Sequence, residues 1–304
     1  FDRITIDDDK VDFFCFEHTS HNIDYEFKIK RGIIHDRFFL GAFLMLFRRN
    51  EEYFQNLILD YEHIKENINA GFVGFTFFIN GEWRNITVDT RVPKHQDDEI
   101  TLSNTETQNA YWMCLFEKAY AKAFKTYDVL NGMLVNDYLV DLTGGWARMT
   151  PFVNNKDSGM DESKKKALLE EIGKALNQKN VIGSMYYDES KLEEDFDSDK
   201  SDDGADDEAI AANCMHNILD AQEDGGVRLI YLVNYWPKGK WTGSYSVEDE
   251  TWEANKALAE RLNYQVSQSD TTSVLRICLL MIVLVISIEY TIVEFSLRVG
   301  LSSV

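Results

Sequence analysis

The pattern of apolar and polar positions predicts three helices in the first 180 or so residues. An apolar run from Phe38 to Phe47 has helical length and is apolar nearly all round, which predicts a buried helix. Asp36 stands just before this run, where its carboxylate can accept the free N–H groups of a first turn. The spacing over residues 109–131 predicts a second buried helix. Residues 161–178 predict a third, polar on its outer face.

Other stretches have the composition of β structure. Residues 71–79 are aromatic and β-branched, and Asn80-Gly81 is a strong hairpin signal because both residues tolerate positive φ. A returning strand follows this turn, and residues 227–246 predict further β structure. Residues 141–145, with two glycines, predict a break and a hinge between two lobes.

The charge balance narrows the classes of function. The chain has 304 residues, with 31 basic and 52 acidic side chains and a formal net charge of -21. This balance argues against a nucleic-acid partner, because binding phosphate needs a basic face. The 44% of hydrophobic residues are enough for a real core, which excludes wholesale disorder. The length suits one large domain or two ordinary ones.

The acidic side chains are concentrated in residues 188–208, which hold 12 acidic and 2 basic residues and so carry a net charge of -10. We expect a solvated insertion there. The alternative is a segment that binds calcium weakly or docks a partner, although it lacks the ligand spacing of an EF-hand loop.

The cysteines indicate the cellular compartment. They are far apart and form no CxxC pair: Cys15, Cys114, Cys214 and Cys278. This pattern favours reduced thiols in a cytoplasmic protein over a disulfide framework or a zinc site. No signal peptide opens the sequence, so we expect a cytoplasmic location, with membrane association as a possibility raised by the C-terminal segment.

Residues 274–288 of that segment are almost uninterruptedly apolar. As a helix they would span roughly 22 Å, against a hydrocarbon core of roughly 30 Å. A longer helix would include Glu289 and Glu294, which are costly inside a membrane. A membrane span, a buried strand or helix, and an error in the gene sequence all remain open.

Five strings, in this order and spacing, resemble the protease core of the calpains, the calcium-activated papain-like cysteine endopeptidases. They are Phe38-Phe39-Leu40-Gly41-Ala42; Gly81-Glu82-Trp83 with Val88-Asp89 and Pro93; Glu117-Lys118-Ala119-Tyr120-Ala121-Lys122; Asp141-Leu142-Thr143-Gly144-Gly145; and Asn234-Tyr235-Trp236 with Trp241-Thr242-Gly243. The resemblance covers about residues 25–265.

The resemblance implies an α+β, papain-like fold of two lobes that face a cleft. Residues 1–145 would form the helical lobe that presents a nucleophile at a helix N-terminus. Residues 146–265 would form the β-rich lobe with a histidine and an asparagine, and would contain the acidic insertion 188–208. Residues 266–304 remain a hydrophobic C-terminal segment of uncertain role.

The site residues of the family carry over unevenly. His216 falls at the family histidine, Asn234 at the asparagine that orients it, and Trp236 at the tryptophan that shields the pair. The nucleophile position, however, is Arg37, and the position of the oxyanion glutamine is Arg31. A guanidinium keeps its proton at any working pH and has no nucleophilic lone pair. The usual mechanism is therefore not expected here.

The calcium positions of the family also diverge. Calpain cores bind one calcium ion in each lobe, and the corresponding positions read Lys28, Ala110, Lys240 and Val247. Calcium needs oxygen ligands, which these side chains do not offer, so we expect no bound cofactor.

Three functions remain open. The favoured one is a non-catalytic calpain-like module that holds a protein or peptide partner in the cleft between the lobes. The second is an active calcium-dependent cysteine endopeptidase, in which Arg37 is a sequence error or a compensated change. The third is a membrane-tethered regulatory subunit anchored through residues 274–288.

Overall fold

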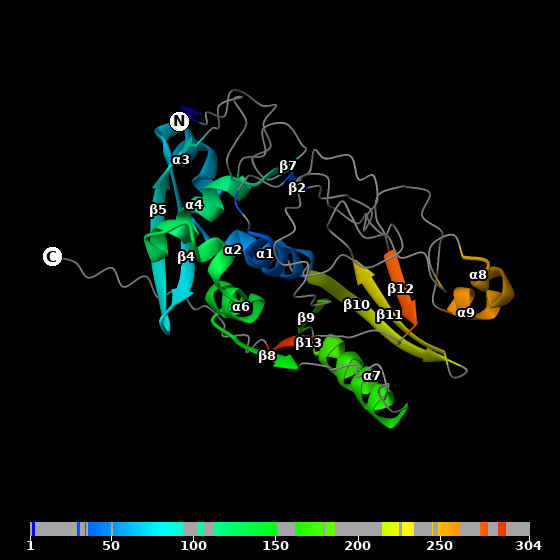
Figure 1. Cartoon of the computed structure of the whole chain (residues 1–304). Coiled ribbons are helices and arrows are strands. Elements are labelled where there is room, and N and C mark those ends of the chain that lie inside the picture. The colour runs from blue at the N-terminus through cyan, green and yellow to red at the C-terminus, as the bar shows by residue number, and fades with distance from the viewer. Residues whose placement is uncertain are drawn as a thin grey trace.

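In the computed structural model, helix α1 (Arg37–Arg49) lies at the centre, between a helix-rich lobe and an antiparallel sheet (Figure 1). The structure describes residues 2–3, 29–30, 34, 36–49, 51–93, 102–105, 112–150, 162–178, 180–185, 215–224, 227–233, 245, 249–261, 274–278 and 285–289. Helix α1 packs against helices of the first lobe and strands of the second, so it joins the two.

The first lobe combines helices with a small sheet. Its other helices are α2 (Glu51–Asn56), the 3-10 turn η3 (Tyr61–His63), α3 (Ile64–Ala70), α4 (Trp112–Phe124), α5 (Val129–Gly132) and α6 (Val135–Thr143). Strands β3 (Ile58–Leu59), β4 (Phe72–Ile79) and β5 (Glu82–Asp89) form a three-stranded antiparallel sheet. Two short pairs join β1 (Asp2–Arg3) to β6 (Arg91–Val92) and β2 (Ile29–Lys30) to β7 (Asn104–Thr105).

The predicted hairpin is confirmed. Strands β4 and β5 pair from Phe72↔Asp89 to Ile79↔Glu82, and the turn between them has φ 54° at Asn80 and 82° at Gly81. Both values lie in the left-handed region that these residues tolerate.

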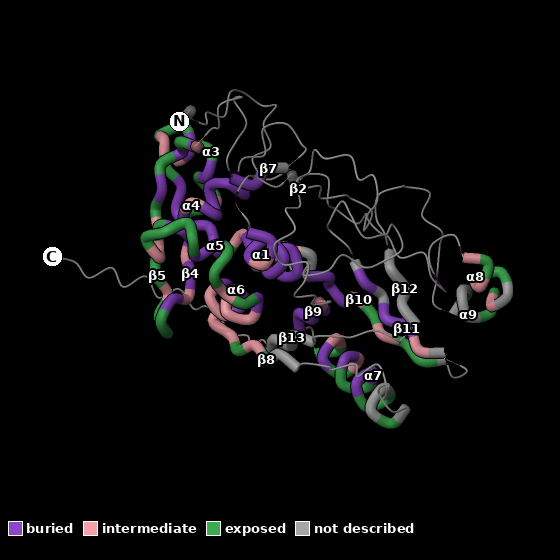
Figure 2. Tube along the Cα trace, in the orientation of Figure 1, coloured by how far each residue is buried: buried purple, intermediate pink, exposed green. Residues whose placement is uncertain are grey.

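The core of the first lobe is aromatic. Phe43 lies against Trp112 and Phe116 with ring centroids 5.1 and 5.2 Å apart, and Phe39 lies 4.8 Å from Tyr120. All five side chains are buried. Figure 2 shows that α1 and α4 are buried over most of their length. The predicted buried helix at residues 38–47 is therefore confirmed as α1.

The predicted helix at 109–131 is in fact interrupted. Lys125 has φ 65°, Thr126 N–H donates to the Ala121 carbonyl at 3.1 Å, and Lys125 N–H donates to the Lys122 carbonyl at 3.2 Å. These two bonds are those of a Schellman motif, which closes the C-terminus of α4. A lysine at this position gives no turn signal in the sequence.

The second lobe is a six-stranded antiparallel sheet within the described part of the chain, in the order β12-β11-β10-β9-β13-β8. Its strands are β8 (Trp146–Thr150), β9 (Val181–Met185), β10 (Met215–Asp224), β11 (Val227–Val233), β12 (Val274–Cys278) and β13 (Val285–Glu289). The strand predicted at the start of residues 227–246 is β11. Most of the remainder of that range lies outside the described residues.

Helix α7 (Glu162–Asn177) covers part of this sheet, which confirms the third predicted helix (Figure 1). Its Leu168 and Ile172 share a buried cluster with Ile218 and Ile230 of the sheet. Arg148 of β8 forms an ion pair with Glu171 of α7. Two short helices, α8 (Thr251–Ala254) and α9 (Lys256–Arg261), follow the sheet strands β10 and β11 in sequence.

The apolar C-terminal segment contributes strands. β12 pairs with β11 from Val233↔Val274 to Leu229↔Cys278, and β13 lies between β8 and β9. The segment around residues 279–284, which joins them, lies outside the described residues. None of the helices in the described ranges combines the length and the apolar character needed to cross a membrane.

Candidate functional site

Arg37, at the expected nucleophile position, is the first residue of α1. In the first turn of the helix, Leu40 N–H donates to the Asp36 carbonyl at 2.9 Å. Asp36 therefore occupies the N-cap position that the sequence predicts. Arg37 is only 9% exposed, and its Cζ lies 5.3 Å from the centre of the Phe38 ring. A guanidinium therefore occupies the start of the central helix.

His216 lies near the start of β10, opposite Ser184 of β9. Its neighbour Met215 is in direct contact with α1, because a Cβ built on Gly41 would stand 2.8 Å from Met215 Cβ. Gly41 lies four residues after Arg37, which is about one helical turn. The structure thus brings positions 37 and 216 onto adjoining elements. His216 is fully buried and Arg37 is largely buried, so both positions are mostly closed to solvent.

The other predicted site residues cannot be placed in this way. Arg31, Asn234 and Trp236 lie outside the described residues, as does the acidic insertion 188–208. The same holds for the expected calcium positions, Lys28, Ala110, Lys240 and Val247. Within the described ranges, no three His, Cys, Asp or Glu side chains come together in a way that could hold a metal ion.

A buried polar cluster beneath the start of α1 was not found from the sequence. Ser103 N–H donates to Glu117 Oε2 at 2.9 Å, and Ser103 Oγ–H donates to Asp36 Oδ2 at 2.9 Å. All three side chains are buried. Burial and the neighbouring Asp36 carboxylate raise the pKa of Glu117 well above its usual range. The only sequence signal was a glutamate among the apolar residues of α4.

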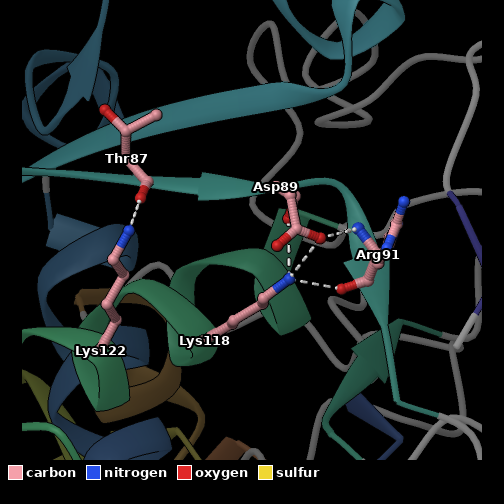
Figure 3. Close-up of polar contacts among 5 residues, drawn as sticks. All are labelled: Thr87, Asp89, Arg91, Lys118 and Lys122. Atoms are coloured by element: carbon pink, nitrogen blue, oxygen red, sulfur yellow. Dashed lines mark hydrogen bonds and ion pairs between the residues drawn. The ribbon is translucent and has the colours of Figure 1, made fainter.

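The lysines of α4 hold the end of the hairpin (Figure 3). Lys118 Nζ donates to Asp89 Oδ1 and the Asp89 carbonyl, both at 2.9 Å, and to the Arg91 carbonyl at 2.6 Å. These acceptors match the three donors of an ammonium group. Lys122 Nζ donates to the Thr87 carbonyl at 2.6 Å. The two lysines attach α4 to β5 and β6.

The predicted hinge at residues 141–145 is the C-terminal end of α6 followed by a turn. Gly144 has φ 66°, and its N–H donates to the Val140 carbonyl at 2.8 Å. Tyr120 OH donates to Asp141 Oδ2 at 2.5 Å, and Tyr53 OH lies 3.2 Å from the carbonyls of Leu142 and Thr143. The chain then enters β8.

A buried central helix held between a helix-rich lobe and an antiparallel sheet is the architecture of the papain-like cysteine proteases. A sequence profile described as "Calpain family cysteine protease" matches residues 13–274, which is most of the chain. The chain therefore belongs to the calpain family, as the five strings indicate.

Individual relatives agree with this assignment. Calpain-5 of Mus musculus is 26% identical over 250 residues, covering 78% of this chain and 38% of its own length. The calpain-2 catalytic subunit of Homo sapiens is 28% identical over 233 residues, covering 74% of this chain and 30% of its own length. Calpain clp-1 of Caenorhabditis elegans is 31% identical over 131 residues, covering 43% of this chain and 16% of its own length. The chain thus matches less than two fifths of each relative.

Proposed function

We propose that this chain is a calpain-type protease core that binds a protein or peptide segment between its lobes without cutting it. One observation carries the proposal: the position that the resemblance assigns to the nucleophile is Arg37, which begins α1 and is largely buried. Peptide cleavage by this family needs a thiolate that attacks the carbonyl carbon. Arginine offers no such atom and adds a cation at that point.

The size of the expected loss is large. Removing the nucleophile of a protease with an analogous mechanism lowers turnover on the order of 10⁶-fold. The resemblance also assigns Arg31 to the oxyanion position, where a neutral donor is expected. The burial of His216 and Arg37 supports the same conclusion, because a substrate carbonyl would have to reach both groups.

The proposed binding does not depend on calcium. The family positions that hold the ion read Lys28, Ala110, Lys240 and Val247, none of which brings a carboxylate. No step of the proposed binding involves the ion. Calcium addition is therefore a control that distinguishes this chain from a calcium-activated endopeptidase.

The proposal is tested by adding the full chain to fluorescently labelled, unfolded casein peptides, with and without millimolar calcium. Fluorescence anisotropy measures binding, and mass spectrometry of the same samples measures the length of the peptides. We expect saturable, calcium-independent binding with peptides of unchanged mass. Cleavage that persists through purification and disappears in the His216→Ala variant would overturn the proposal.

One observation favours the second candidate, an active endopeptidase. His216 is retained on a strand that adjoins the helix of position 37. Under this alternative the gene itself would encode cysteine at position 37, and the arginine would be an error. Resequencing that codon from genomic DNA decides between the two, since a cysteine codon would restore the nucleophile.

A further inference from the structure

Two carboxyl groups from different parts of the chain meet one serine beneath the start of α1. Asp36 precedes the helix, Glu117 lies in α4, and Ser103 lies just before β7. The Ser103 main-chain N–H bonds to Glu117, and its hydroxyl bonds to Asp36, each at 2.9 Å. A single residue therefore holds both carboxyl groups within one solvent-free space.

Two negative charges are very costly in such a space. Burial disfavours the charged form of a carboxyl group, and a second carboxylate at hydrogen-bonding range disfavours it further. The nearby Lys118 ammonium is bound to the Asp89 side chain and to the Asp89 and Arg91 carbonyls. Glu117 Oε1 receives no hydrogen bond from any donor in the described ranges. A proton on that oxygen would make it a donor toward Asp36.

We infer that Glu117 is protonated and shares its proton with the Asp36 carboxylate, and that this pair positions the first turn of α1 and with it residue 37. The remaining negative charge lies on Asp36, at the N-terminus of the helix, where the partial positive charge of the peptide N–H groups stabilises it. Glu117 is a positioning residue in this arrangement, because it acts on position 37 through Asp36. The inference does not depend on whether the chain cuts peptides.

Other titratable groups face this pair. Cys114 of α4 is fully buried, and this burial raises the pKa of its thiol. Tyr138 of α6 lies within the electrostatic reach of Asp36, and Tyr127 within that of Glu117. Their neutral forms persist through the neutral pH range, because their pKa values are raised. Arg37 is the cation nearest to Asp36 in sequence. At neutral pH these groups keep their own protons and do not take up the one that Glu117 and Asp36 share, so that proton stays on the two carboxyl groups.

A direct test is infrared spectroscopy of the full chain in H₂O and in D₂O near pH 8, where Asp141, with a pKa raised by burial to about 6, is ionised. We expect a C=O stretching band of a protonated carboxyl group that shifts in D₂O and is absent from the Glu117→Gln variant. A purely structural role for an ionised Glu117 would produce no such band. Absence of the band in the native chain, or its persistence in Glu117→Gln, would overturn the inference.

A comparison of two variants at position 117 tests the positioning role. Glutamine copies a protonated glutamate, since its oxygen can accept the Ser103 N–H and its NH₂ can donate to Asp36. We expect Glu117→Gln to keep the thermal midpoint within about 2 °C of native, a shift of about 1 kcal/mol for a chain of this size. Glu117→Ala should lower the midpoint and speed hydrogen exchange of the first-turn amides of α1. If glutamine proves as disruptive as alanine, the ionised form was needed and the inference is wrong. If the alanine variant does not fold, the glutamine variant and the infrared band still decide.

Discussion

Gly41 of α1 lies directly against Met215 of β10, so that a Cβ at position 41 would stand 2.8 Å from Met215 Cβ and 3.1 Å from its Cγ. The obstructing atoms belong to the root of the methionine side chain, which cannot move without its strand. This contact joins the central helix to the strand that carries His216. The spacing between the lobes thus depends on the absence of a side chain at one residue.

The Gly41→Ala variant should therefore destabilise the fold. Overpacking a buried contact costs about 1–3 kcal/mol, which exceeds the helix-propensity gain of up to about 1 kcal/mol for replacing glycine. The control is Gly173→Ala in α7, where a new Cβ would meet nothing within 4 Å. Chemical denaturation should show a loss for the first variant and a gain of roughly 0.5–1 kcal/mol for the second. Equal gains for both would contradict the contact.

Lys118 should matter more than Lys122, although both are in α4 (Figure 3). Lys118→Met removes the donor that Asp89 and the Arg91 carbonyl share, at a cost of about 1–2 kcal/mol, because these acceptors are exposed and can bond to water instead. Lys122→Met removes one exposed bond to the Thr87 carbonyl and should cost less than about 1 kcal/mol. Urea denaturation at pH 7 measures both losses. A larger loss of stability for Lys122→Met than for Lys118→Met would refute the greater role of Lys118.

The contact between Lys118 and Asp89 also gives a prediction at low pH. Burial raises the pKa of Asp89, but the hydrogen bonds from Lys118 and the Arg91 N–H outweigh it, so that the net pKa is lowered. A carboxylate with a lowered folded-state pKa stabilises the fold above its usual pKa, and this contribution is lost as the pH falls through the folded value. The stability difference between native and Lys118→Met should therefore shrink below about pH 4. A stability difference that stays constant down to pH 2 would contradict the lowered pKa of Asp89.

Asp141 should titrate near neutrality. Burial raises its pKa to about 6, although the hydrogen bond from Tyr120 lowers it and the nearby Asp137 raises it. A raised folded-state pKa favours the fold while the group is protonated, so this contribution is lost as the pH rises from about 4 to about 6. Asp141→Asn should remove that part of the pH dependence, while contributions from the Asp36 and Glu117 pair cancel in the difference. Denaturation of both proteins across this range makes the comparison.

Carboxyl-carbon NMR titration tests the cause of the Asp141 shift. Tyr120→Phe removes the bond that lowers the pKa of Asp141, so the midpoint should move above 6. Tyr53→Phe is the matched control, since the Tyr53 hydroxyl donates to the Leu142 and Thr143 carbonyls of α6. A lower midpoint in Tyr120→Phe would contradict the account.

The elements that were predicted correctly are those that depend on local patterns of apolar, polar and turn residues. The apolar run gave α1, the Asn80-Gly81 turn gave the hairpin, and the polar-faced stretch gave α7. The interruption at Lys125 was missed because lysine in a left-handed conformation carries no compositional signal. The apolar stretch at 274–288 was ambiguous because a short apolar run does not distinguish a strand from a helix. Only its pairing with β8, β9 and β11 defines it as strands.

The residues of the candidate site also divide into those that the sequence predicted and those that it did not. Arg37 and His216 were found from motif strings, and the structure brings their elements together. The Asp36, Ser103 and Glu117 cluster was missed because its members come from three separate segments, whose proximity depends on the packing of α1 against α4. An isolated glutamate in a helix usually faces solvent, so its burial could not be predicted.

A casein cleavage assay on the purified full chain, with and without millimolar calcium and beside the Arg37→Cys variant, tests directly whether the chain is proteolytically inactive. We expect the native chain to release no peptides under either condition. Cleavage by the Arg37→Cys variant alone would show that the loss of activity lies at position 37. If neither protein cleaves casein, the loss extends to Arg31 and the calcium positions. Cleavage by the native chain would contradict the account.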